Sequence, residues 1–330
     1  MTFKLIHLSK IKPTLPLIFR LSLTGALLTW VYLSIGADVL LQTWKIINIK
    51  FLFLAVLIQT FGYVFGSLRW WLLLKRAGIR IPFFEALSLC YLGLFFNQFL
   101  PAGIGGDAVR IYKLYQRGYA GPASAASTII DRLVGLVALL ILTWLAVLLS
   151  EVKILPTTAE FMIGILMVAS LTGGLLFFFL PSSRIVTALV SRFNLQSIAG
   201  RFLKTLRACR TGSFRLLIAA LLLSLILQSI MILVYAILAR ALDIDISLPI
   251  LFFAIPIVFV ATILPFSLGG LGVRESALIA VLGLMGVEME QSGQLALAYL
   301  ITLWLSIIPG GWSLVFGTRD WTFGRKAAIK

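Results

Sequence analysis

The sequence predicts an all-α polytopic membrane protein, and its composition and apolar runs support that fold class. Hydrophobic residues make up 61% of the 330-residue chain, charged residues make up only 12%, and the mean hydropathy is +1.07. Soluble domains carry roughly a quarter charged residues. Several apolar runs are also long enough to cross a bilayer, which takes about 20 helical residues. The composition therefore excludes a water-soluble globule, a disordered chain and a coiled coil.

The apolar runs predict six full transmembrane helices and two interrupted segments within one integral membrane domain, 1–330. The six spans are 17–36, 51–68, 124–149, 161–180, 216–238 and 293–316. The interrupted segments are 83–106 and 249–287, with breaks at 101–107 and 265–272. Pro101 and Pro265 are the expected hinges, because proline removes a helical donor and the paired glycines that follow unwind the chain. Irregular backbone at membrane depth must face protein or a wet cavity, so both breaks are candidates for a functional site and should lie close together in a shared interior of the bundle.

Charge predicts the orientation of these spans. The chain carries 28 Lys and Arg against 12 Asp and Glu, a net charge of +16. The basic connections are 69–82, 107–122 and 184–215, whereas the short segments 150–160 and 239–248 contain acidic residues. By the positive-inside rule we expect a bacterial cytoplasmic (inner) membrane protein with both termini and the basic loop 184–215 in the cytoplasm. Topology then explains the excess charge, and no nucleic-acid partner is expected. The loop 184–215 also fits an amphipathic helix on anionic lipid.

The two breaks repeat one sequence pattern. Leu100-Pro101-x-x-Ile104-Gly105-Gly106-x-x-Val109-Arg110 aligns with Leu264-Pro265-x-x-Leu268-Gly269-Gly270-x-x-Val273-Arg274. An odd number of predicted spans separates the motifs, which is the mark of an inverted-topology repeat in transporters. The expected repeats are 51–149 and 216–316. The alternative is two unrelated Pro-Gly kinks.

Short motifs along the chain resemble a known family of membrane proteins. In order, they are Arg69-Trp70-Trp71-x-Leu73-Leu74, Phe96-Asn97-Gln98-Phe99-Leu100-Pro101, Gly105-Gly106-Asp107-x-x-Arg110, Ile130-Asp131-Arg132 and Pro265-x-x-x-Gly269-Gly270-Leu271-Gly272-Val273-Arg274-Glu275. Together they are similar to the flippase-like transmembrane region of lysylphosphatidylglycerol synthases. The resemblance implies a stand-alone lipid-translocating module without the aminoacyltransferase domain. The family usually has Glu where this sequence has Asp131, which shortens the reach of that carboxylate.

Arg110 and Arg274 are the strongest candidates for substrate binding. A guanidinium offers a planar donor fork suited to phosphate, and neighbouring glycines let backbone amides approach a ligand. The alternatives are that Arg110 extends to the cytoplasmic surface and that Arg274 pairs with Glu275 or Asp243. The full expected substrate-binding set is Arg110, Arg274, Gly105, Gly106, Gly269, Gly270, Asn97 and Arg132.

Three carboxylates, Asp107, Asp131 and Glu275, are expected to couple transport to ions or to pair with the arginines. Asp107 is expected to hold Arg110 or Arg132, or to cap a helix. Asp131 and Arg132 are neighbours in sequence, so they should point to different helix faces. Two structural roles are also predicted: Asn97 satisfies carbonyls freed at the first break, and Gly62-x-x-x-Gly66 forms a helix-packing face.

These observations favour a lipid translocase that moves a phospholipid or lipid-linked precursor, with membrane lipids as its partners. The alternative is a non-transporting protein that presents lipid to, or scaffolds, a separate lipid-modifying enzyme. A membrane-embedded transferase is disfavoured, because His7 is the single histidine and no nucleophile–base pair is evident. Cys90 and Cys209 lie in different segments. We therefore expect no catalytic residue, cofactor or metal site.

Overall fold

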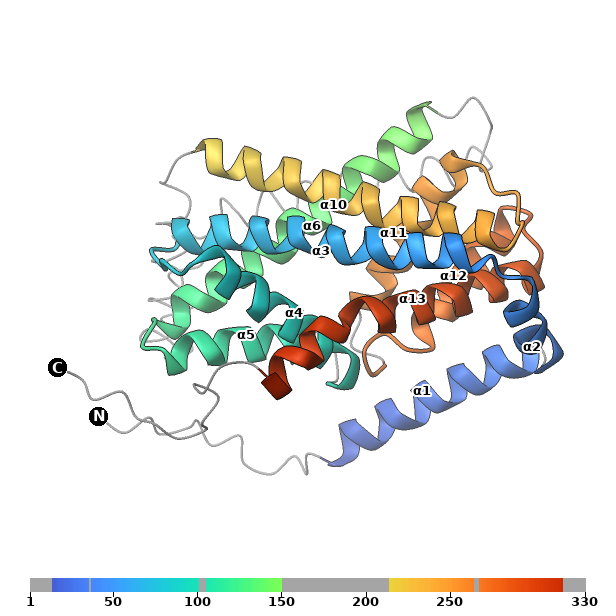
Figure 1. Ribbon diagram of the computed structural model, residues 1–330, viewed down its shortest axis with the longest axis horizontal. Helices are drawn as coiled ribbons and strands as arrows, with labels where there is room; N and C mark the ends of the chain where they lie inside the picture. The colour runs from blue at the N-terminus through green and yellow to red at the C-terminus, as the bar shows by residue number, and fades with distance from the viewer. Residues whose placement is uncertain (1–13, 36, 101–104, 150–213, 264–266, 317–330) are drawn as a thin grey trace, which may run out of the picture.

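The computed structural model describes residues 14–35, 37–100, 105–149, 214–263 and 267–316, and the regular elements in these ranges are α-helices (Figure 1). No strand occurs among them. Four of these helices are long and apolar enough to cross a membrane: α3 (Ile49–Arg76), α6 (Gly121–Leu149), α10 (Phe214–Ala241) and α13 (Met289–Phe316). They coincide with four of the predicted spans. The helical class is therefore confirmed.

The other predicted spans have different outcomes. Helix α1 (Thr14–Ile35) covers the first of them, and 161–180 lies outside the described residues, as does the loop 184–215. A short helix that the sequence analysis did not predict, α2 (Ala37–Ile46), follows α1. The count of six full spans stays a prediction.

Helices α3 and α10 run antiparallel along the length of the bundle (Figure 1). The backbone amide of Asn48, just before α3, donates to the backbone carbonyl of Ala241 at the end of α10 over 2.8 Å. Gly62 and Gly66 lie at their contact, because a Cβ on Gly62 would come within 2.7 Å of the Met231 side chain. The predicted packing role of these glycines is confirmed, since a small residue lets two helices approach closely.

The first interrupted segment forms a hairpin of α4 (Phe83–Phe99) and α5 (Gly105–Gln116). Helix α4 ends where Leu100 becomes extended, because the proline that follows disfavours helical geometry at the residue before it. The two arms touch backbone to backbone, since a Cβ on Gly106 would overlap the carbonyl of Gly93. The hairpin opens at the end of the bundle where α3 ends.

The second interrupted segment forms a hairpin of α11 (Leu248–Ile263) and α12 (Val273–Leu284). It opens where α10 ends and α13 begins, which is the opposite end of the bundle (Figure 1). Gly269, Gly270 and Gly272 have φ angles of 59°, 78° and 79° in the turn before α12, a left-handed region that favours glycine.

The two breaks meet inside the bundle, as the sequence predicts. A Cβ on Gly269 would lie 2.8 Å from the Cα of Gln98, so the turn of the second hairpin rests on the end of α4. Residues 101–104 and 264–266, with both predicted hinges, lie outside the described residues. The opposed hairpins are what an inverted repeat requires, while the two-fold relation between the halves stays a prediction.

One boundary prediction is wrong. The sequence analysis ended the second span at 68 and assigned Arg69 to a basic cytoplasmic connection. Helix α3 instead continues to Arg76, and Arg69 is only 7% exposed. The apolar run continues through Trp70 to Leu74, and a carboxylate within the bundle pairs with the arginine, so one charge does not end the helix.

Candidate functional site

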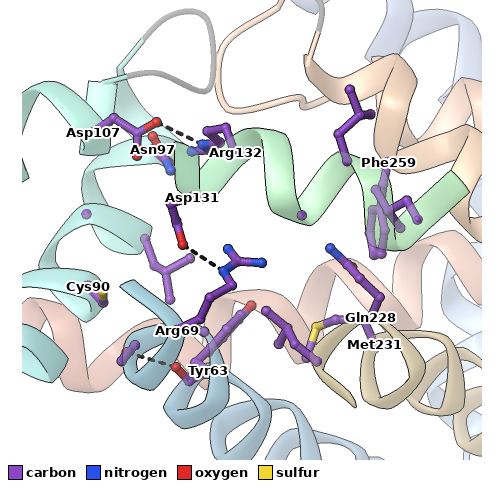
Figure 2. Close-up of a pocket in the computed structure, with 18 of the residues that line it drawn as sticks. Tyr63, Arg69, Cys90, Asn97, Asp107, Asp131, Arg132, Gln228, Met231 and Phe259 are labelled. Carbon is purple, nitrogen blue, oxygen red and sulfur yellow. Dashed lines mark hydrogen bonds and ion pairs between the residues drawn. The ribbon is translucent and has the colours of Figure 1, made fainter. Parts of the chain in front are cut away.

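A cavity of about 320 Å³ lies inside the bundle, lined by residues of α3, α4, α5, α6, α10, α11 and α13 (Figure 2). One wall carries charged side chains from α3, α5 and α6. The opposite wall is mainly apolar, with Leu139, Leu227, Met231 and Phe259. The cavity is therefore amphipathic: it offers ionic contacts on one side and hydrocarbon on the other.

The charged wall is an alternating chain of three arginines and two aspartates, which we call the arginine–aspartate ladder: Arg69, Asp131, Arg110, Asp107 and Arg132. Arg69 Nε lies 2.6 Å from Asp131 Oδ1, and Arg110 Nη1 lies 3.9 Å from Asp131 Oδ2. Asp107 pairs with Arg110 and, over 2.8 Å, with Arg132 Nε. These five are the charged residues among the described residues that line the cavity, and together they carry one positive charge in excess.

The ladder confirms two predictions about its members. Asp107 holds both Arg110 and Arg132. Asp131 and Arg132 are neighbours on α6 yet pair with different partners, Asp131 with Arg69 and Arg132 with Asp107 (Figure 2). Both carboxylates are about 5% exposed or less, and buried charges of this kind persist only when paired.

Arg110 is held on every side by protein groups. Besides the two aspartates, its Nη1 lies 3.5 Å from the Cys90 sulfur, and its guanidinium carbon lies 4.7 Å from the centre of the Trp70 ring. The residue is 7% exposed, so it does not extend to the membrane surface. Arg110 lines the cavity with its main donors already engaged, and its role in substrate binding stays a prediction.

Asn97 lines the cavity and has a structural role different from the expected one. Its side-chain oxygen accepts a hydrogen bond of 2.7 Å from the Gly106 amide, whereas the sequence analysis expected it to satisfy freed carbonyls. The Gly106 amide is thereby occupied in this conformation. Gly105 lies close against the Leu100 side chain, and the four motif glycines act in close contacts and turns.

The second break holds a closed ion pair. Arg274 donates to Glu275 Oε1 from Nε (3.1 Å) and Nη2 (2.8 Å), and Glu275 Oε2 accepts from the Gly272 amide over 2.7 Å. The guanidinium carbon lies 5.4 Å from the centre of the Tyr299 ring, and Tyr299 lines the cavity. Of the two carboxylates predicted as possible partners of Arg274, the structure therefore pairs it with Glu275 and not with Asp243.

The predicted set therefore divides in two. Asn97, Asp107, Arg110, Asp131 and Arg132 line the cavity. Gly105, Gly106, Gly269, Gly270, Arg274 and Glu275 are not among its described lining residues.

Two further lining residues, Arg69 and Gln228, were not among the predicted site residues, although Arg69 belongs to a motif of the family resemblance. Both are polar residues inside apolar helices, which is the signal that could have found them.

These features define a polytopic helical membrane protein whose two helix breaks meet beside a buried, charged cavity. The family model for the lysylphosphatidylglycerol synthase TM region matches residues 17–310, and the chain belongs to that family. The resemblance inferred from the motifs is confirmed.

Curated relatives point the same way. The chain is 26% identical over 140 residues to a UPF0104 membrane protein of Pyrococcus horikoshii, which is 42% of this chain and 41% of the relative. It is 32% identical over 94 residues to a UPF0104 membrane protein of Archaeoglobus fulgidus, or 28% of this chain and 29% of the relative. Each alignment thus spans less than half of the relative's length. No solved structure matches the chain.

Proposed function

We propose that this protein translocates a phospholipid or a lipid-linked precursor across the membrane. The observation that carries the proposal is the amphipathic cavity at the meeting point of the two breaks, with its one excess positive charge. A phosphate head group complements the charged wall, since arginine contacts to phosphate are among the strongest hydrogen bonds in proteins. The acyl chains stay in the bilayer while the head group passes through the bundle.

The test is reconstitution of the purified protein into phosphatidylcholine vesicles that contain a trace of fluorescently labelled phosphatidylglycerol. Loss of fluorescence on adding membrane-impermeant dithionite measures how much labelled lipid reaches the outer leaflet. A protein that translocates lipid exposes nearly all of the label, whereas protein-free vesicles expose only the outer half.

A matched pair of variants on α6 ties any transport to the cavity. Leu136 lines the cavity, so Leu136→Trp fills part of the space that the head group must pass through. The transport rate should fall roughly tenfold or more, which corresponds to a barrier raised by about 1.4 kcal/mol or more. Leu145 is 41% exposed on the outer face of the same helix, so Leu145→Trp should leave the rate unchanged. No transport by folded wild-type protein would favour the alternative, a partner that presents lipid to a separate enzyme.

We also propose a bacterial cytoplasmic-membrane location with both termini and the basic loop 184–215 in the cytoplasm, on the basis of the charge distribution. Cysteines introduced at Lys45 and Arg201, in a Cys209→Ser background, test it in intact cells. An impermeant maleimide should label position 45 and leave position 201 unlabelled until the membrane is opened. Labelling of both positions in intact cells would contradict the orientation.

A further inference from the structure

We infer that the head-group site lies at the centre of the cavity, between Arg69 on α3 and Gln228 on α10, and that it takes a phosphodiester carrying one negative charge. The inference deepens the proposed function and rests on it for the identity of the transported molecule. The binding chemistry, however, follows from the donors that face the cavity.

Arg69 presents a hydrogen-bond donor that the protein leaves unused. Its Nε donates to Asp131 over 2.6 Å and its Nη1 donates to the Ser224 hydroxyl over 2.9 Å. Within the described part of the chain, Nη2 has no partner, although the residue is only 7% exposed. Figure 2 shows the guanidinium pointing into the middle of the cavity. Nη2 is not among the fully buried polar atoms that lack a partner, so it is open to the cavity and can donate to a ligand there.

Gln228 faces Arg69 from the other side. It lines the cavity from α10, and its side-chain amide has no hydrogen-bond partner among the described residues. In Figure 2 the amide points toward the Arg69 guanidinium. Gly135 on α6 keeps the space beside them open, because a Cβ there would lie 3.1 Å from Arg69 Nη1. Donors from two helices therefore converge on one point, as phosphate oxygens require.

Arg110 acts differently, as a positioning residue. Asp107, Cys90 and the Trp70 ring hold its guanidinium, and it lies beside the same Asp131 carboxylate that binds Arg69. Arg110 thereby fixes Asp131, and Asp131 fixes Arg69. The ligand contact itself falls to Arg69, a residue that the sequence analysis assigned to a loop.

The charge of the ladder selects the charge of the ligand. Its three arginines and two aspartates leave one positive charge among the described lining residues. A phosphodiester such as phosphatidylglycerol brings one negative charge and makes the cavity neutral. A phosphocholine brings its own cation and leaves the surplus in place, while a doubly charged phosphomonoester leaves a surplus of the opposite sign. Arg69, Asp131, Arg110 and Asp107 are buried, so either surplus is unfavourable there, while solvent screens part of the charge of Arg132, whose side chain is 49% exposed.

The shape of the cavity favours a lipid head group over a free phosphate ester. A volume of about 320 Å³ is at the small end of ligand pockets, so it holds a head group and not a whole lipid. Leu227, Met231 and Phe259 line the wall beyond the two donors and offer contacts to hydrocarbon. Both sources of phosphate share the same charged contacts, and a binding experiment separates them.

Native mass spectrometry of the purified full chain in detergent measures this binding without any transport. The probes are phosphatidylglycerol, phosphatidylcholine and phosphatidic acid, with soluble glycerophosphoglycerol, a phosphodiester that carries the same single charge as phosphatidylglycerol, as competitor. We expect wild-type protein to bind phosphatidylglycerol at least tenfold more tightly than either other lipid, and glycerophosphoglycerol not to displace it. Equal binding of the three lipids would overturn the charge assignment, and displacement by glycerophosphoglycerol at the same concentration would overturn the lipid assignment.

Two variants test the named residues, each with a matched control. Arg69→Lys keeps the charge but loses the donor fork, so phosphatidylglycerol affinity should fall at least tenfold, whereas Arg240→Lys, at an exposed arginine of α10, should bind as wild type. Gln228→Leu removes the second donor and should lower affinity severalfold, with the exposed Gln42→Leu as control. Gln228 is not part of an ion pair, so Gln228→Leu should fold normally. It therefore tests the site even if Arg69→Lys folds poorly.

The outcomes separate this site from the proposed function. Wild-type affinity in Gln228→Leu, or in folded Arg69→Lys, would overturn the site. Selective binding that both variants weaken, together with no lipid movement in vesicles, would leave the site standing and refute translocation. Lipid movement in vesicles together with equal binding of the three lipids would support translocation and overturn the site.

Discussion

The two helix breaks carry the same Gly-Gly-x-x-Val-Arg pattern, yet their arginines have different roles. Arg110 at the first break belongs to a ladder with one excess positive charge that lines the cavity. Arg274 at the second break forms a neutral pair with its neighbour Glu275, and Tyr299 lies between that pair and the cavity. The comparison teaches that a repeated motif does not repeat its chemistry. The arginine of the first motif lines the charged cavity, and the arginine of the second motif pairs within its own turn.

Different hydrogen bonds hold the backbone at the two breaks. Asn97, from the same hairpin, closes the first break on the Gly106 amide. The second break is held from outside its hairpin, because the Thr24 hydroxyl of α1 accepts from the Leu268 amide over 3.1 Å. The first hairpin also contacts other helices, since Asp107 pairs with Arg132 of α6 and the turn at Gly269 rests on Gln98 of α4.

The largest expected effect on stability concerns the closed pair. Glu275→Gln leaves Arg274 buried without a carboxylate partner among the described residues, and removing one member of a buried ion pair costs about 3–5 kcal/mol. Thermal unfolding of the purified protein in detergent should show a large drop in Tm. The double variant Arg274→Met with Glu275→Gln should recover most of it, because no buried charge remains. A single variant as stable as wild type would refute a structural role for this pair.

A smaller effect is expected where the two arms of the first hairpin touch. Gly106→Ala forces a methyl group into the Gly93 carbonyl, and overpacking of this kind costs about 1–3 kcal/mol. Gly283→Ala on α12 is the matched control, since its Cβ would meet nothing within 4 Å. Alanine there should be neutral or stabilising by about 0.5–1 kcal/mol, because glycine is a poor helix former. Equal Tm changes for both variants would show that the Gly93–Gly106 contact is not tight.

Sequence reasoning reached the helical class, the family and the meeting of the two breaks. These features depend on local signals, namely apolar runs, prolines with paired glycines, and ordered motifs. It also named both arginines, Arg110 and Arg132, as candidate partners of Asp107, and the structure pairs Asp107 with both. Apolar periodicity and motif spacing carry that information directly.

The two residues at the centre of the site, Arg69 and Gln228, could not be predicted from such local signals. Arg69 lay beside other cations at the end of an apolar run, so the positive-inside rule explained it without a partner. Its pairing with Asp131 and Ser224 joins α3 to α6 and α10, and only the packed bundle brings these residues together. Gln228 sits in an apolar span with no motif around it. Long-range packing decided both positions.

The most direct test of the central claim replaces the two motif arginines by lysine and compares lipid transport in vesicles at equal amounts of folded protein. Arg110→Lys keeps the charge but cannot bridge Asp107 and Asp131, so transport should fall roughly tenfold, the equivalent of one charge-assisted contact. Arg274→Lys still pairs with Glu275 away from the cavity and should transport nearly as wild type. Arg240→Lys, at an exposed arginine of α10, should leave transport unchanged. Equal losses in the two lysine variants, or a loss confined to Arg274→Lys, would contradict the different roles of the two motif arginines.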